Sequence, residues 1–393
     1  MKTTNQSIPN ATIWVILPVL FSYFVMGFCD AVGIASNYVK QDFCLSETQA
    51  NLLPSMVFLW FFFFSVPVGM LMNKIGRKKT VLISLAFTLI AMLIPYFVYN
   101  FPMILFAFAL LGIGNTILQV SLNPLLTNVV SPRLLTSSLT AGQFVKAICS
   151  FCAPIIAAFT ALHYGNWQLM FPIFAFITLM SGLWLLATPI QEKSETKQTV
   201  SLLGTFSLLK NKSLFLLFLG IVFVVGVDVG INVVAPKLLI EKCGLPLSEA
   251  GYGTSIYFVF KTLGAFVGAF LLAKVSSLKF FRISIIIAFL VLVLLSIAKS
   301  EWLILSCISI IGFTCANIFS IIFGIALQRM PQKVNEISGL MIMGVSGGAV
   351  IPLIMGYFTE QFSSTLGALM VIGFCIVYLA YSAFSLKEKV DNL

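Results

Sequence analysis

Long apolar runs separated by short polar segments follow one another along the whole chain. A membrane-spanning helix needs about 20 mainly apolar residues, and twelve runs are long enough to be candidates. The strands of a membrane β-barrel would instead be short and alternate between apolar and polar residues. The predicted spans are residues 12–38, 47–72, 79–99, 103–130, 135–161, 167–189, 213–240, 248–273, 281–298, 302–327, 338–358 and 364–386. The pattern therefore predicts an all-α polytopic membrane protein.

The first six spans have counterparts among the last six. Asp30 lies in the sequence Gly-Phe-Cys-Asp-Ala-Val-Gly, and Asp228 lies in Gly-Val-Asp-Val-Gly, each inside an apolar span. Serine followed by glutamate, which is typical of a capped helix start, precedes spans 2 and 8. The further matches, all at offsets of 198 to 202, are Leu45-Ser46-Glu47 with Leu247-Ser248-Glu249, Gly112 with Gly312, Pro132 with Pro331, and Pro154 with Pro352.

The repeat predicts the domain organisation. Because six is an even number, both copies enter the membrane in the same direction and are related by an axis along the membrane normal. We expect an N-terminal six-helix bundle over residues 1–190 and a C-terminal six-helix bundle over residues 213–393, related by pseudo-two-fold symmetry. Residues 191–212, rich in Lys, Glu, Ser and Thr, are the predicted cytoplasmic linker.

Composition and charge agree with a membrane protein and fix its predicted orientation. The 393 residues are 60% hydrophobic and 9% charged, with a mean hydropathy of +1.06, which excludes an ordinary soluble domain. Of the 23 Lys and Arg residues, 17 fall on the side of the two termini, at span ends or in loops, and four fall on the other side, while Lys146 and Lys261 lie deep inside spans. Positive loops stay inside, so we expect both termini in the cytoplasm and the protein in the cell inner (plasma) membrane. The net charge of +10 is then topological, and we expect no nucleic-acid partner.

The sequence offers no chemistry for catalysis. It has one histidine, His163, which we expect in a loop between spans 5 and 6. It has no metal-ligand cluster, no nucleotide-binding phosphate loop and no nucleophile elbow. We therefore expect no catalytic residues, no metal and no cofactor, and an ion gradient as the energy source. A proton gradient is our prediction, and sodium stays open as the coupling ion.

Four charged residues lie at bilayer depth: Asp30, Lys146, Asp228 and Lys261. Such residues cost about 2.5–3.5 kcal/mol each on insertion scales, so each normally has a partner or faces a cavity. One interpretation is two structural ion pairs, Asp30 with Lys146 and Asp228 with Lys261. The other is functional: a proton on one aspartate frees a lysine, which then attracts the carboxylate of a uronic or sialic acid. Asp30 and Asp228 are the predicted proton-coupling residues.

Polar residues at helical spacing predict a hydrophilic binding surface. Asn115, Gln119 and Asn123 recur every four residues and so share one face of span 4. Three similar pairs are Gln143 with Lys146, Asp228 with Asn232, and Tyr257 with Lys261. Amide, hydroxyl and ammonium groups that converge from both halves suit a ligand rich in hydroxyl groups.

A loop motif adds a family resemblance. Residues 69–79, Gly-Met-Leu-Met-Asn-Lys-Ile-Gly-Arg-Lys-Lys, resemble the loop 2–3 signature of the major facilitator superfamily, whose fold has two bundles of six helices. The glycine of this motif implies close helix contact. Asn73 stands where the family usually has Asp, so we expect a weaker charge relay in this loop.

A narrower resemblance lies in the second half. Residues 338–356, residues 317–323 and the pair Asn123-Pro124 are similar to the fucose:proton symporter family, which includes glucose/galactose permeases. The resemblance implies a central cavity lined by helices 1, 4, 7 and 10, and proton-driven sugar uptake by alternating access. The chain departs from the family at three places: Gln119 replaces a glutamate, Lys146 replaces an asparagine, and the acid of span 1 is Asp30, about a turn from the usual position.

From the residues and the resemblance together, we predict a transporter that imports a sugar or sugar acid with protons. The predicted substrate-binding residues are Asn115, Gln119, Asn123, Gln143, Lys146, Asn232, Tyr257, Lys261 and Asn317. A neutral hexose permease with structural lysine pairs is one alternative, and drug or metabolite efflux by proton antiport is another. We expect a monomer whose partners are a small hydrophilic substrate and the lipid bilayer.

Overall fold

The computed structural model describes residues 11–45, 49, 52–192, 202–245, 250 and 252–386. Over these residues it contains twelve helical spans that are long and apolar enough to cross a membrane, as the hydropathy pattern predicts. Their ends differ from the predicted ones by a few residues. The serine caps predicted before spans 2 and 8 lie outside the described residues.

The helices of the first half are α1 (Ala11–Met26), η1 (Gly27–Ala31), α2 (Val32–Asp42), α4 (Leu52–Ile75), α5 (Arg77–Phe97), α6 (Phe101–Val129), η2 (Pro132–Leu134), α7 (Leu135–Tyr164), η3 (Trp167–Leu169) and α8 (Met170–Ala187). Those that follow are α9 (Leu202–Ser207), η4 (Leu208–Lys210), α10 (Lys212–Cys243), α12 (Tyr252–Leu271), α13 (Ser277–Ile297), α14 (Glu301–Cys315), α15 (Ile318–Arg329), η5 (Pro331–Lys333), α16 (Val334–Met343), η6 (Gly344–Ser346), α17 (Gly347–Phe362) and α18 (Leu366–Ser385).

Two local details differ from the sequence predictions. Residues 202–210 of the predicted linker form the short helices α9 and η4. His163 lies in the last turn of α7 and stacks on Phe159, with 4.2 Å between ring centroids, so the expected loop position is wrong. The helix continues past residue 161 because the left-handed Gly165 ends it.

Three spans are interrupted near their middle. Span 1 passes through the 3₁₀ turn η1 between α1 and α2, span 10 breaks between α14 and α15, and span 11 passes through η6. Span 7, by contrast, is the single helix α10 over 32 residues. Short 3₁₀ stretches inside a helix often mark functional hinges. The breaks therefore distinguish span 1 from its repeat partner, span 7.

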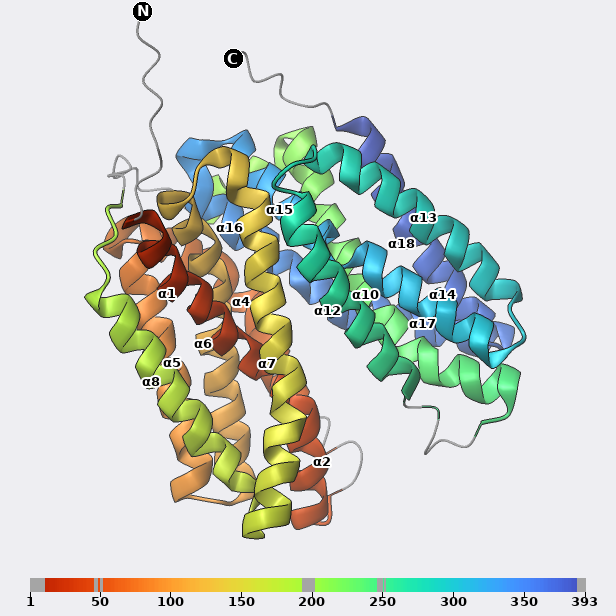
Figure 1. Ribbon diagram of the computed structural model, residues 1–393, viewed down its shortest axis with the longest axis horizontal. Helices are drawn as coiled ribbons and strands as arrows, with labels where there is room; N and C mark the ends of the chain where they lie inside the picture. The colour runs from red at the N-terminus through yellow and green to blue at the C-terminus, as the bar shows by residue number, and fades with distance from the viewer. Residues whose placement is uncertain are drawn as a thin grey trace, which may run out of the picture.

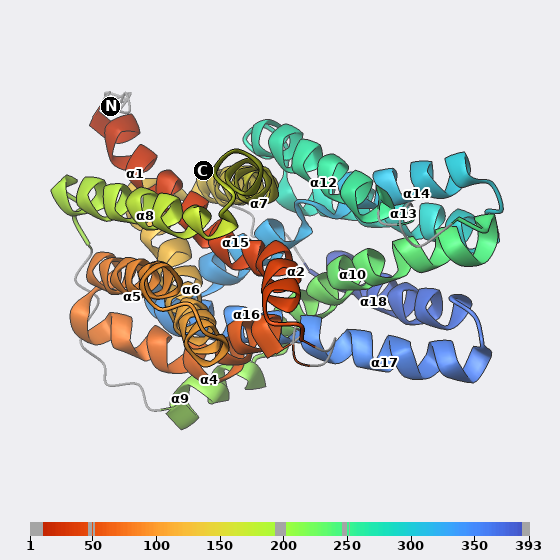
Figure 2. The same ribbon diagram turned by 90° about the horizontal axis from the view of Figure 1, so that it is seen from below.

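The first six and the last six of the twelve spans form two groups, one on each side of the molecule (Figures 1 and 2). The groups meet where α4 packs on α16 and where α7 packs on α12 and α15. Glycines allow the first contact: a Cβ atom on Gly69 would lie 2.6 Å from the Asn335 carbonyl oxygen, and one on Gly339 would lie 2.6 Å from that of Ser65. Small residues permit such close approach of membrane helices. The close contact predicted for Gly69 is confirmed.

Both α1 and α18 have their terminal ends at one end of the molecule, the upper end in Figure 1. We name it the basic end, because Lys74, Lys78, Arg329 and Lys333 lie in its helix ends and loops. Six hydrogen bonds between the described residues of the two halves lie toward this end. The two halves diverge toward the opposite end (Figure 1). The structure is thus held together at the basic end.

Candidate functional site

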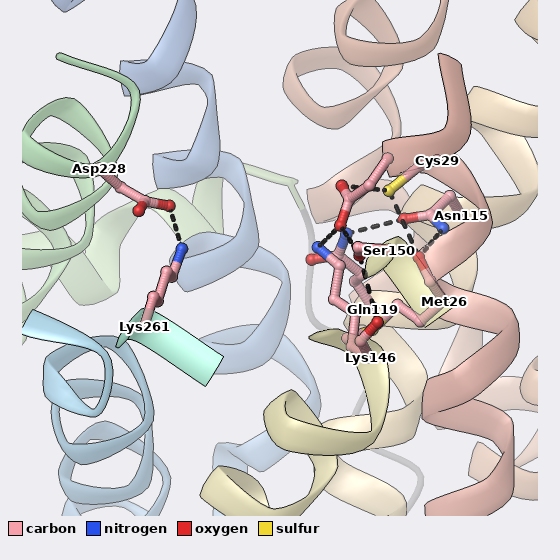
Figure 3. A network of polar contacts seen from close by, with 9 residues as sticks. Met26, Cys29, Asn115, Gln119, Lys146, Ser150, Asp228 and Lys261 are labelled. Atoms are coloured by element: carbon pink, nitrogen blue, oxygen red, sulfur yellow. Dashed lines mark hydrogen bonds and ion pairs between the residues drawn. The ribbon is translucent and has the colours of Figure 1, made fainter. Parts of the chain in front are cut away.

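Two ion pairs lie near the middle of the spans, one in each half (Figure 3). In the first half, Asp30 on η1 faces Lys146 on α7, with 3.4 Å between Oδ2 and Nζ. In the second half, Asp228 on α10 faces Lys261 on α12, with 2.5 Å between Oδ2 and Nζ. Both pairings named in the structural interpretation are present, but each joins two helices of the same half, so the expectation that these ion pairs hold the halves together is wrong. We call these four residues the four-charge cluster.

The 3₁₀ turn η1 sets the position of Asp30. A Cβ atom on Gly27 would lie 2.7 Å from the Lys146 carbonyl oxygen and 2.7 Å from the Cys149 Cβ, so only glycine lets η1 approach α7 this closely. The Ser150 hydroxyl donates to Asp30 Oδ2 at 2.6 Å, and the Cys29 thiol donates to Oδ1 at 3.3 Å. The carboxylate thus has three partners, two of them on α7.

The second pair is more tightly coordinated. Besides its contact with Lys261, Asp228 accepts a hydrogen bond on Oδ1 from the Tyr257 hydroxyl at 2.7 Å. Tyr257 and Lys261 reach one carboxylate because they are one helical turn apart on α12. The Asn232 amide donates to the Asp228 backbone carbonyl at 3.1 Å, and its own Oδ1 has no hydrogen-bond partner. The shared faces predicted for these residues are confirmed.

All four charges are partly open to solvent. The exposed fractions of the side chains are 21% for Lys146, 34% for Asp30 and 31% for both members of the second pair. The two pairs face each other from the two halves (Figure 3), and each is near enough to interact electrostatically with the other. When all four groups are ionised, their charges cancel. The cluster therefore adds no net charge to the middle of the spans.

The predicted stripe on α6 forms a chain of hydrogen bonds. Gln119 donates to the Asn115 side-chain oxygen at 2.7 Å, and Asn115 donates to the carbonyl of Met26 at 2.8 Å. Asn123 accepts from the Tyr23 hydroxyl at 2.7 Å. These amides are buried against α1, with 1–7% of each residue exposed. In this conformation the stripe connects α6 to the helix that leads to Asp30, and its contact with substrate stays a prediction.

The remaining predicted residues differ in their surroundings. Gln143 is partly buried on α7, one turn before Lys146. Asn317 is 1% exposed and donates to the carbonyl of Gly264 on α12 at 2.9 Å. Gly268 leaves the space that its side chain fills. Asn317 therefore supports the break between α14 and α15 in this conformation, and a substrate contact there stays a prediction.

A second polar network, at the basic end, was not predicted from the sequence. Asn73 on α4 donates to Glu336 on α16 at 2.5 Å, and Asn335 donates to Asn73 at 2.6 Å. Arg77 joins them by donating to Asn335 at 2.7 Å. Glu336 is 3% exposed, and its Oε2 has no hydrogen-bond partner. We missed Glu336 because span 11 was predicted to begin at residue 338, which placed it in a loop.

Comparisons with known proteins agree with this geometry. A family model described as Major Facilitator Superfamily matches residues 19–351 and 217–392. The glucose/galactose transporter of Brucella abortus biovar 1 (strain 9-941) is 25% identical over 377 residues, which cover 91% of this chain and 90% of that one. The "Probable nitrate transporter NarT" of Staphylococcus epidermidis (strain RP62A) is 24% identical over 335 residues, 82% of this chain and 83% of that one.

Solved structures share the fold. A crystal structure of a variant of the E. coli fucose:proton symporter FucP matches with a TM-score of 0.84 and 16% identity over 96% of this chain and 100% of that one. A crystal structure of FucP in the outward conformation matches with a TM-score of 0.85 and 17% identity over the same shares. Two halves of six spans, each contributing one ion pair, are thus set on a fold that known membrane transporters use.

Proposed function

The chain belongs to the Major Facilitator Superfamily, a family of transporters and not of enzymes, and we propose that it imports a sugar or sugar acid together with protons. In this proposal it is a secondary active transporter that works by alternating access in the cell inner membrane. The substrate binds between the two halves, and the inward proton gradient supplies the energy.

The four-charge cluster is the observation that carries the proposal. A scaffold with no transport role would have little use for four partly exposed charges at mid-membrane, because each is costly there. Titratable carboxylates paired with lysines give a means of coupling, since a proton and a substrate group can compete for the same partners. Asp30 and Asp228 are the proposed proton-coupling residues.

The proposed substrate site combines the two lysines with neutral polar groups. Lys146 and Lys261 are open to solvent by 21% and 31%, and Gln143 lies on the same face of α7 as Lys146. The proposed contacts from the other helices are Asn115, Gln119, Asn123, Asn232, Tyr257 and Asn317. Those that are buried in this conformation would reach substrate after the halves move.

The basic end is the proposed cytoplasmic end, because loops rich in Lys and Arg stay inside. Since the halves are bonded together at that end and diverge at the other, this conformation would then be the outward-facing one. The similarity to FucP in the outward conformation supports this assignment. Substrate would enter from outside and meet the four-charge cluster first.

Two other substrates have support from relatives. A neutral hexose is favoured by the glucose/galactose transporter of Brucella abortus, and a small inorganic anion is favoured by the NarT relative. The lysine pairs suit an anion, whereas the amide groups suit a sugar. A sugar acid satisfies both sets of groups.

Uptake into proteoliposomes tests the proposal. The purified protein is reconstituted, and an inward proton gradient is imposed with fucose, galactose, glucose, glucuronate, N-acetylneuraminate or nitrate outside. We expect accumulation of at least one sugar or sugar acid above its external concentration, and its collapse when a protonophore is added. Accumulation driven by sodium alone, or of nitrate alone, would contradict the proposal, as would proton-driven export.

A further inference from the structure

The two lysines break the symmetry of the repeat. Asp30 and Asp228 occupy matching positions 198 residues apart, but Lys146 lies in span 5 and Lys261 in span 8. The corresponding stretches of the partner spans, residues 344–348 and 59–63, carry no charge. The lysines are therefore additions to the repeated plan, one in each half, on helices that are not repeat partners.

Both lysines lie on helices that contact each other across the halves. The helices α7 and α12 pack together, and the rings of Phe144 and Phe266 meet there with centroids 5.0 Å apart. Lys146 lies two residues beyond Phe144 along α7, and Lys261 lies five residues before Phe266 along α12. Both steps lead away from the basic end. At 1.5 Å per residue the lysines lie about 3 Å and about 7.5 Å beyond the ring contact. Both lysines therefore lie where the two halves begin to diverge.

In this conformation each lysine is held by its own half. Lys146 pairs with Asp30 and Lys261 pairs with Asp228, so neither ion pair joins the halves. We propose that the substrate is a monoanion whose carboxylate binds Lys146 and Lys261 together, while a proton on Asp30 takes the place of Lys146. This inference rests on the proposed function and narrows its substrates to sugar acids.

The charge balance fixes the stoichiometry. The ionised cluster has no net charge, a bound carboxylate brings one negative charge, and one proton on Asp30 restores neutrality. One proton therefore accompanies each anion, and the pair crosses the membrane without moving net charge. A neutral sugar carried with one proton would instead move one positive charge per cycle. Electroneutral transport thus distinguishes the two substrate classes.

Geometry selects Asp30 as the acid that takes the proton. Its distance to Lys146 is 3.4 Å, longer than the 2.7–2.9 Å of a strong charged hydrogen bond, whereas Asp228 lies 2.5 Å from Lys261. The charged and titratable groups that face Asp30 are Lys146, the thiols of Cys29 and Cys149, and Lys261 from the other half. Lys146 is therefore the cation that is more readily released.

Bridging would also close the site. A carboxylate that binds both ammonium groups connects α7 to α12 on the far side of the ring contact, whereas the hydrogen bond from Ser137 to the Ala269 carbonyl joins these helices on the near side. Charge-assisted hydrogen bonds are stronger than neutral ones, and a neutral sugar lacks these contacts. The anion would thus draw the opposite ends of the halves together.

Binding and transport measurements on the full chain test this inference. Calorimetry on purified protein compares glucuronate with glucose, and nitrate serves as the inorganic anion. We expect glucuronate to bind at least tenfold more tightly than glucose, and Lys146→Gln and Lys261→Gln each to remove that preference. Lys146→Arg keeps the charge and should retain part of it. Lys237→Gln, an exposed lysine on α10, is the matched control and should bind as the wild type does.

Uptake into proteoliposomes then distinguishes a failure of the anion inference from a failure of the proposed function. We expect glucuronate uptake to rise with the proton gradient and to be unchanged by a valinomycin-imposed membrane potential. Proton-driven uptake of a neutral sugar that the potential stimulates would overturn the anion inference and leave the proposed function standing. Lysine-dependent binding of nitrate without glucuronate would also overturn it. No binding or uptake of any sugar would overturn both.

Discussion

The side-chain amide of Asn73 donates a hydrogen bond to the carboxylate of Glu336 at 2.5 Å, across the two halves at the basic end. In the superfamily pattern that the loop resembles, an aspartate usually occupies the position of Asn73. Here the acid of the contact belongs to the second half instead, and Glu336 is almost fully buried. The contact requires an amide donor in one half and a carboxylate acceptor in the other. A substitution that removes the donor therefore tests its role.

Asn73→Asp should weaken closure of the basic end. Two carboxylates about 4 Å apart repel by up to about 4 kcal/mol near a protein surface, so the closed state should lose population. Hydrogen exchange of the α16 amides should become at least tenfold faster. Glu336→Gln added to Asn73→Asp supplies a donor again and should restore slow exchange. If the double variant exchanges as fast as the single one, the contact does not hold the end closed.

Asp30→Asn should separate binding from coupling. The amide cannot take a proton, so glucuronate affinity should lose its dependence on pH, whereas wild-type affinity should fall about tenfold per pH unit once the proton no longer binds. Counterflow at equal concentrations should persist, but pH-driven accumulation should vanish. Radiolabelled uptake measures both. Loss of counterflow as well would indicate a binding or folding role for Asp30.

Gly27→Ala should disturb the first ion pair. Its Cβ would lie 2.7 Å from two atoms of α7, so η1 must move away from Lys146, at a cost of about 1–3 kcal/mol. We expect a lower melting temperature and at least tenfold weaker glucuronate binding. Gly356→Ala on α17, where a Cβ atom has no neighbour within 4 Å, is the control and should be neutral or slightly stabilising. Equal effects of the two changes would contradict this reasoning.

Gln119→Glu should weaken the binding of anionic substrates. Gln119 donates to Asn115, which in turn donates to the carbonyl of Met26, at the end of α1 that leads into η1 and Asp30 (Figure 3). A carboxylate there removes the donor and adds a negative charge that competes for Lys146. We expect glucuronate binding to weaken at least tenfold while glucose binding changes little, as calorimetry would show. Gln143→Glu tests whether any acid on these helices has the same effect. Unchanged glucuronate affinity in Gln119→Glu would show that residue 119 lies too far from the substrate to affect its binding.

Much of the fold could be predicted because a bilayer constrains sequence strongly. Apolar length gave the twelve spans, and helical spacing placed Tyr257 and Lys261 on one face of α12. The partners of both aspartates also followed from the need to pair a charge in the membrane. These predictions rest on local periodicity and on the cost of burying charge, which a sequence displays directly.

Other features depend on contacts that a sequence does not display. Nothing in residues 27–31 predicts the turn η1, since no proline interrupts the span there. Asn317 has the polarity of a cavity residue, but its partner is a backbone carbonyl of α12 that only the packing brings near. Glu336 has the composition of a loop residue and is buried because α4 covers it. Each outcome is decided by a neighbour far away in the sequence.

The break in span 1 has no equivalent in span 7, where α10 is continuous past Asp228. A continuous helix shifts as a unit, so the backbone at Asp228 moves only together with the rest of α10. Asp30 lies on a 3₁₀ turn, which can convert to α-helix and so move independently of the helices on either side. Two halves descended from one plan therefore differ in stiffness at the same position. That difference places local adjustment around Asp30 in span 1, whereas the backbone of Asp228 moves only together with the rest of α10.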